Sequence, residues 1–175
     1  MSAITGHVVF SHGLDSSPFS TKIRALYEIA EGEGFEVAAV DYRGINDPEE
    51  RVQMLADFCR DFSGHLVLVG SSLGGYVSLA AAPTLHARGV FLMAPALYPP
   101  RVPPLKRGVP TCPIALVHGW RDEVIPHEES MRFANENKLA LHLVESDHRL
   151  HSAIPFLRYL FQYFLVESRR AQFVT

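Results

Sequence analysis

The sequence predicts a three-layer α/β/α sandwich with a mainly parallel sheet of about six strands. Short runs rich in Val, Ile, Leu and Phe recur along the chain, and segments with helical periodicity lie between them. The runs are nearly continuous instead of alternating, as is typical of strands buried on both faces, and strands that alternate with helices imply right-handed crossovers. The expected strands cover residues 7–10, 35–40, 65–69, 90–93, 114–117 and 140–144.

Five helices are expected between and after these strands. Ser17 and Pro18 have the residue types of an N-cap and a first helical position, and glycines at 32 and 34 end that pattern. Asp47, followed by Pro48 and Glu50, resembles a capping box and predicts the start of a second helix. Further helices are expected over residues 72–82, 128–137 and 151–164.

One long stretch, residues 94–113, has no regular pattern. It contains seven of the twelve prolines of the chain. Proline removes a backbone donor and interrupts both helices and central strands, so this stretch is expected to be an irregular loop over the sheet edge.

Length and composition limit the classes of protein to consider. A chain of 175 residues, 47% of them hydrophobic, can bury one sizeable core and is expected to form a single domain over residues 1–175. No apolar run approaches the ~20 residues of a membrane span, and residues 1–6 lack the features of a signal peptide. With only two cysteines, the chain is expected to be a soluble cytoplasmic protein without disulfides.

Charge and histidine content exclude two kinds of partner. The net charge is −3 and both signs are interspersed, so no basic stripe is available for nucleic acid. Nine histidines occur, but none has the spacing of a metal-binding motif, and no metal or other cofactor is expected. The oligomeric state is left open.

The strongest motif follows the third expected strand. Gly70-Ser71-Ser72-Leu73-Gly74 matches the GxSxG nucleophile elbow in its required context of strand, tight turn and helix. The strained turn needs small residues two positions before and after the nucleophile, which glycine supplies on both sides. The alternatives are an ordinary turn rich in Gly and Ser, or a phosphate-binding loop, for which the Gly-Lys-Ser/Thr sequence is absent.

A serine nucleophile needs a base and a group that orients the base. Asp122 follows the fifth expected strand and His148 follows the sixth, so both are expected at the edge of the sheet where Ser72 lies. His151 is the alternative base, but it should already be entering the last helix. Backbone N–H groups of Leu14 and Leu73 are the expected oxyanion hole.

On these motifs the chain resembles an α/β-hydrolase over almost its whole length. The run His12-Gly13-Leu14-Asp15-Ser16-Ser17-Pro18 and the small size are similar to YqiA-type bacterial esterases. The resemblance implies a minimal α/β-hydrolase fold without a lid domain, and hydrolysis of carboxylic esters through an acyl-enzyme formed by Ser72, Asp122 and His148. It also implies that no cofactor takes part.

The sequence departs from the family pattern in two places. It begins at the strand before the oxyanion loop, so the first two strands of the usual eight are missing, and a short proline-rich loop replaces the lid. Leu97, Tyr98 and Trp120 are therefore expected to line a shallow pocket for a small-molecule ester with a short acyl group. An amidase, thioesterase or peptidase using the same triad stays open, as does a non-enzymatic binding module on the same scaffold.

Overall fold

The computed structural model describes residues 6–170 and contains a six-stranded sheet in which every pair of neighbouring strands is parallel. The strand order is β2-β1-β3-β4-β5-β6, which confirms the predicted fold class. The strands are β1 His7–Ser11, β2 Glu36–Val40, β3 Leu66–Ser71, β4 Gly89–Met93, β5 Ile114–Gly119 and β6 Ala140–Val144. Residues 1–5 and 171–175, the two ends of the predicted domain, lie outside the described residues.

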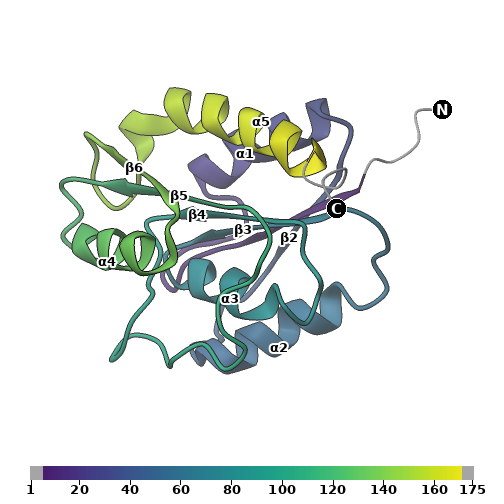
Figure 1. Cartoon of the computed structure of the whole chain (residues 1–175), viewed down its shortest axis with the longest axis horizontal. Helices are drawn as coiled ribbons and strands as arrows, with labels where there is room; N and C mark the ends of the chain where they lie inside the picture. The colour runs from purple at the N-terminus through teal and green to yellow at the C-terminus, as the bar shows by residue number, and fades with distance from the viewer. Residues whose placement is uncertain (1–5, 171–175) are drawn as a thin grey trace.

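Helices cover both faces of the sheet (Figure 1). Helices α1 (Thr21–Gly32) and α5 (Ile154–Arg170) pack side by side on one face, where Leu26 and Phe161 belong to the same core cluster. Helices α2 (Pro48–Phe58), α3 (Leu73–Ala81) and α4 (His127–Asn137) contribute to a second cluster on the other face. No helix within residues 6–170 is both long and apolar enough to cross a membrane.

Burial along the strands follows their position in the sheet. Every residue of the three consecutive strands β3, β4 and β5 is buried, whereas the edge strands β2 and β6 are partly exposed. The strands also end in register, since Ser71 lies beside Met93 and Gly119 lies beside Val144. The loops after β3, β5 and β6 therefore emerge at one edge of the sheet, which is where a parallel sheet places a binding site.

Two helix boundaries differ from the sequence prediction. The prediction that α1 begins at Pro18 is wrong, because Ser17 Oγ accepts a hydrogen bond from the Phe19 N–H and closes a local turn that competes with the helix. Helix α5 begins later than predicted, after a 3₁₀ turn over His151–Ala153, and it extends to Arg170. The contribution of Leu165 to the core accounts for part of that extension.

Residues 94–113 contain no helix or strand, as predicted. The segment packs on the face that carries α2, α3 and α4, and Val102 is buried in that core. Side chains fasten it to both flanking helices: Lys106 pairs with Glu49 of α2, and Arg101 pairs with Glu129 of α4. It is thus a crossover from β4 to β5 that lacks a helix of its own.

Candidate active site

Ser72 occupies a strained turn between β3 and α3. Its φ of 56° lies in the left-handed region that side chains other than glycine rarely adopt. The turn is possible because its neighbours are glycines: a Cβ on Gly70 would lie 2.1 Å from the Gly74 carbonyl oxygen, and one on Gly74 would lie 2.0 Å from that of Ser11. The glycine spacing in the sequence therefore reflects direct steric exclusion.

The structure brings Ser72, His148 and Asp122 into one hydrogen-bonded chain. His148 Nδ1 lies 2.7 Å from Asp122 Oδ2, and His148 Nε2 lies 3.1 Å from Ser72 Oγ. Because a carboxylate only accepts hydrogen bonds, Nδ1 carries the proton, which leaves Nε2 to accept the Ser72 hydroxyl proton. His148 thus has the tautomer that a general base requires.

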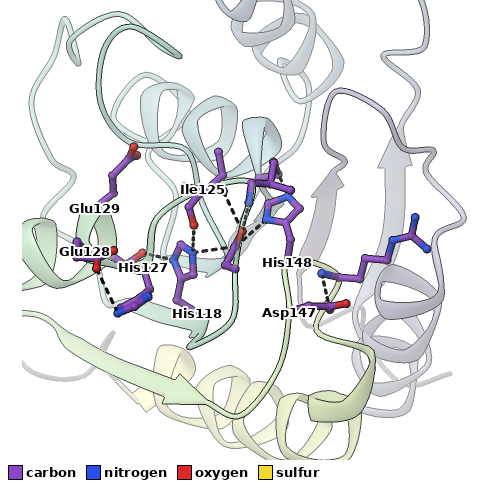
Figure 2. A network of polar contacts seen from close by, with 12 residues as sticks. His118, Ile125, His127, Glu128, Glu129, Asp147 and His148 are labelled. Carbon is purple, nitrogen blue, oxygen red and sulfur yellow. Dashed lines mark hydrogen bonds and ion pairs between the residues drawn. The ribbon is translucent and has the colours of Figure 1, made fainter.

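Asp122 is held by four donors in a buried setting. Oδ1 accepts hydrogen bonds from the N–H groups of Val124 (2.9 Å) and Ile125 (2.8 Å), while Oδ2 accepts from His148 and from His118 Nε2 (3.0 Å). Figure 2 shows His118, Ile125 and His148 gathered around this contact. Burial alone would raise the pKa of Asp122, but the hydrogen bonds from His118, His148 and Ile125 outweigh it and hold the pKa well below its usual value.

The orientation of His118 follows from its neighbours. Its Nε2 faces two acceptors, Asp122 Oδ2 and the Ile125 carbonyl oxygen at 3.0 Å, so Nε2 carries a proton. Its Nδ1 lies 2.7 Å from Ser130 Oγ in α4, which can donate to it. The His118 ring therefore donates a second hydrogen bond to Asp122 Oδ2, the oxygen that also accepts from His148.

The backbone N–H groups of Leu14 and Leu73 have no hydrogen-bond partner within residues 6–170. The Ser72 N–H, in contrast, donates to the Met93 carbonyl oxygen. The loop that carries Leu14 lies against the nucleophile, since a Cβ on Gly13 would be 3.1 Å from Ser72 Cβ. Two unpaired donors beside a serine hydroxyl match the requirement of an oxyanion hole.

A cavity of about 730 Å³ opens over these groups, and Leu14, Ser72, Leu73 and His148 all line it. This volume lies within the range of small-molecule sites. His151 lies on the wall, but no hydrogen bond joins it to Ser72 in the described part of the chain. Ser72 and His148 therefore both face the cavity, whereas Asp122 does not line it.

The sequence matches the model of the Alpha/beta hydrolase family over residues 8–172. The chain belongs to the α/β hydrolase family. The family supports a hydrolytic activity, and the site geometry described above is where that activity would reside. No curated protein sequence matches this α/β hydrolase.

Solved structures agree with this assignment. A protein of the α/β hydrolase superfamily from Xanthomonas campestris pv. campestris is 31% identical, with a TM-score of 0.85, and the match covers 93% of this chain and 99% of the other. Two more distant structures share the fold. Est1E from Butyrivibrio proteoclasticus is 17% identical (TM-score 0.79, coverage 95% and 89%), and a Xanthomonas campestris serine hydrolase without a lid is 19% identical (TM-score 0.74, coverage 94% and 83%). The closer likeness to YqiA-type esterases stays a prediction.

The residues expected to bind substrate lie elsewhere in this α/β hydrolase. Leu97 is buried in the core cluster beside α3, and the Tyr98 hydroxyl donates to Glu136 of α4. Trp120 is half exposed and packs edge-on against His127. None of the three predicted residues lines the cavity that contains Ser72. Their closeness in sequence to strand ends does not bring them to the site.

Two charged residues near the site were not anticipated. Lys22 of α1 is 7% exposed, lines the cavity and donates from Nζ to the His148 carbonyl oxygen at 3.3 Å. Burial lowers its pKa to about 8 against the attraction of Asp122 and Asp147. Arg51 of α2 is fully buried. Lys22 and Arg51 each lie four residues before a buried leucine of the same helix. A charged residue at that spacing lies on the apolar face of the helix, and this pattern could have indicated from the sequence that both side chains are buried.

Residues 6–170 contain no group of three or more His, Cys, Asp or Glu side chains arranged to hold a metal ion.

Proposed function

We propose that this α/β hydrolase is a serine esterase that cleaves carboxylic esters of small or short-acyl substrates through an acyl-enzyme intermediate. The observation that carries the proposal is the 3.1 Å contact between Ser72 Oγ and His148 Nε2, with His148 Nδ1 held by Asp122 at 2.7 Å. Contacts of this length allow proton transfer without rearrangement of the side chains.

The reaction proceeds in two halves. Ser72 Oγ attacks the ester carbonyl carbon as His148 Nε2 takes the hydroxyl proton, and the electron pair of the carbonyl bond moves to its oxygen. The Leu14 and Leu73 N–H groups donate hydrogen bonds to that oxyanion. When the carbonyl re-forms, the bond to the alkoxy group breaks, the leaving alcohol takes the proton from His148, and Ser72 remains acylated.

Water completes the cycle. It attacks the acyl carbonyl and gives a proton to His148 Nε2, and collapse of the second tetrahedral intermediate breaks the bond to Ser72 Oγ. Oγ recovers the proton and the carboxylic acid leaves. Asp122 stays ionised throughout, because its hydrogen bonds favour the charged form.

Turnover of p-nitrophenyl acetate and labelling by a fluorophosphonate probe test the proposal. We expect the parent to show both and Ser72→Ala to lose both, with turnover reduced by several orders of magnitude, because the probe and the ester require the same oxygen. Ser71→Ala is the matched control: Ser71 precedes the nucleophile, but no hydrogen bond joins it to His148. Equal turnover by Ser72→Ala and the parent would refute the assignment.

A panel of p-nitrophenyl esters and matched p-nitroanilides addresses the other leaving groups. An esterase should favour the esters, while an amidase or peptidase should cleave the anilides efficiently. A binding module on this scaffold would show neither turnover nor labelling.

A further inference from the structure

Arg51 is a fully buried cation on α2 that has no ion pair with a carboxylate in the described part of the chain. Its guanidinium instead donates to four backbone carbonyl oxygens: those of Ile45 (2.7 Å), His12 (3.1 Å), Gly13 (3.3 Å) and Tyr42 (3.4 Å). Burying a charge without such partners would be costly. The four hydrogen bonds to these carbonyl oxygens therefore compensate for burying the Arg51 charge.

The four carbonyls belong to two separate loops. His12 and Gly13 follow β1 and precede the expected oxyanion donor, whereas Tyr42 and Ile45 follow β2. Arg51 thus crosslinks the loop after β1 to the loop after β2. A planar guanidinium with five N–H donors can hold several carbonyls at once, which a lysine ammonium does less well.

The direction of the Leu14 N–H depends on the orientation of the Gly13 carbonyl, because both belong to the same planar peptide. Its oxygen is held by Arg51 and by His12 Nδ1 at 2.7 Å. The His12 ring is itself fixed, because Nε2 accepts the Tyr42 N–H at 2.9 Å and so leaves the proton on Nδ1. Burial also lowers the pKa of His12 and favours this neutral ring.

The Gly13–Leu14 peptide transmits this restraint to the site. It is trans, since the only cis bond within residues 6–170 joins Pro99 to Pro100. In a planar trans peptide the C=O and the following N–H point in opposite directions. A Gly13 carbonyl drawn toward Arg51 and His12 therefore aims the Leu14 N–H away from them. Leu14 lines the cavity, and its N–H has no hydrogen-bond partner within residues 6–170.

We propose that Arg51 is a positioning residue that aims the Leu14 N–H into the oxyanion hole by holding the Gly13 carbonyl. The inference rests on the proposed esterase function. It adds a requirement that the triad alone does not contain: full catalysis needs a buried cation on α2 that touches neither substrate nor triad.

The test compares Arg51→Met and Arg51→Lys with Arg43→Gln. Arg43 lies in the same loop after β2, but it is exposed and paired with Asp41. Loss of one oxyanion donor typically lowers kcat by about 100- to 1,000-fold, so misdirecting one should lower kcat by roughly 10- to 100-fold with little change in KM. Arg51→Lys should lie between Arg51→Met and the parent, and Arg43→Gln should match the parent.

Two readouts separate positioning from a purely structural role. A trifluoromethyl ketone forms a tetrahedral adduct whose oxyanion occupies the hole, so its Ki should rise in proportion to the fall in kcat/KM. In a further variant, Arg51→Ala, which leaves space for a small cation, added guanidinium should restore part of the turnover by filling the vacated site. Fluorophosphonate titration normalises all rates to intact sites, and Arg51→Lys carries the comparison if Arg51→Met is recovered unfolded.

A lower melting temperature with unchanged kcat per titrated site and unchanged Ki would overturn the inference. A parent protein that neither turns over esters nor reacts with the probe would instead contradict the proposed function. The two failures are therefore distinct.

Discussion

At the scale of single residues, the site is organised around the Asp122 carboxylate. Two imidazoles and two backbone N–H groups donate hydrogen bonds to this carboxylate, and together they fix its orientation. An ionised acid at Nδ1 keeps His148 in one tautomer and stabilises the imidazolium that forms when Nε2 takes a proton. As a result, the protonated Nδ1 of His148 faces Asp122, and the unprotonated Nε2 faces Ser72.

His148 and His151 provide a direct test of this arrangement. His148→Ala should lower kcat by several orders of magnitude, because within residues 6–170 no other side chain is hydrogen-bonded to Ser72 Oγ. His151→Ala should cost far less, since His151 begins the 3₁₀ turn and lies on the cavity wall without that contact. Steady-state kinetics with p-nitrophenyl acetate measure both variants. A dead His151 variant beside an active His148 variant would show that the base has been misassigned by one helical turn.

The site residues that could be predicted from the sequence are those marked by a short motif or by a position at the end of a strand. Ser72, Asp122 and His148 were found because parallel strands bring their carboxyl ends together, so spacing along the chain translates into proximity. Arg51 was not found, because its partners are backbone carbonyls up to 39 residues away and carry no side-chain signature. Tyr98 was placed in the pocket by its nearness to β4, but its hydroxyl is drawn to Glu136 instead.

At the scale of elements, β3 and α3 are connected by a single residue, Ser72. The helix begins at Leu73, directly after the nucleophile, and packs so closely on β1 that Gly74 nearly touches the Ser11 carbonyl. Space for a side chain on this inner face of the turn is absent. The position of Ser72 therefore depends on how closely α3 packs against β1.

Gly74→Ala should destabilise the protein by about 3 kcal/mol or more, because the new methyl would meet a backbone oxygen that cannot move alone. Gly32→Ala is the matched control. No atom lies within 4 Å of the Cβ position there, so alanine should be neutral or stabilise α1 by up to about 1 kcal/mol. Urea unfolding monitored by circular dichroism gives both free energies. A Gly74 variant as stable as the parent would mean that the elbow tolerates a wider separation of α3 from β1.

The ends of elements were harder to predict than their existence. Asp47 was recognised as a helix cap, and its side chain does accept the Glu50 N–H at 2.9 Å. Serine is also favoured at helix N-caps, yet the Ser17 hydroxyl accepts the Phe19 N–H and forms a turn, while α1 begins at Thr21. The local sequence does not show whether such a residue will cap a helix or close an isolated turn. Packing against the sheet determines the residue at which the helix begins.

At the scale of the whole molecule, the proposed catalytic residues and part of the cavity wall come from different parts of the chain. Ser72, Asp122 and His148 follow β3, β5 and β6, whereas Arg101 reaches the cavity wall from the crossover between β4 and β5. That crossover contains no helix or strand and stands in place of a lid. A long acyl chain would therefore find only the cavity wall itself to cover it.

Esters of short acids should be the preferred substrates. Each further buried CH₂ contributes ~0.8 kcal/mol only where apolar surface exists to cover it. We expect kcat/KM across p-nitrophenyl esters to be highest at acetyl to butyryl and to fall with longer chains. A steady rise from acetyl to dodecanoyl would contradict the prediction and point to an apolar channel beyond the described cavity.

The way this crossover is fastened has a consequence for how such a protein can diversify. Lys106 with Glu49, Arg101 with Glu129 and Tyr98 with Glu136 hold it to α2 and α4 through side chains, not through the hydrogen-bond ladder of a strand. Exposed residues between these anchor points, unlike the buried Val102, can vary while the sheet and the turn at Ser72 stay as they are. Arg101 brings this segment to the cavity wall, so a substitution there would alter which substrates fit without altering the sheet.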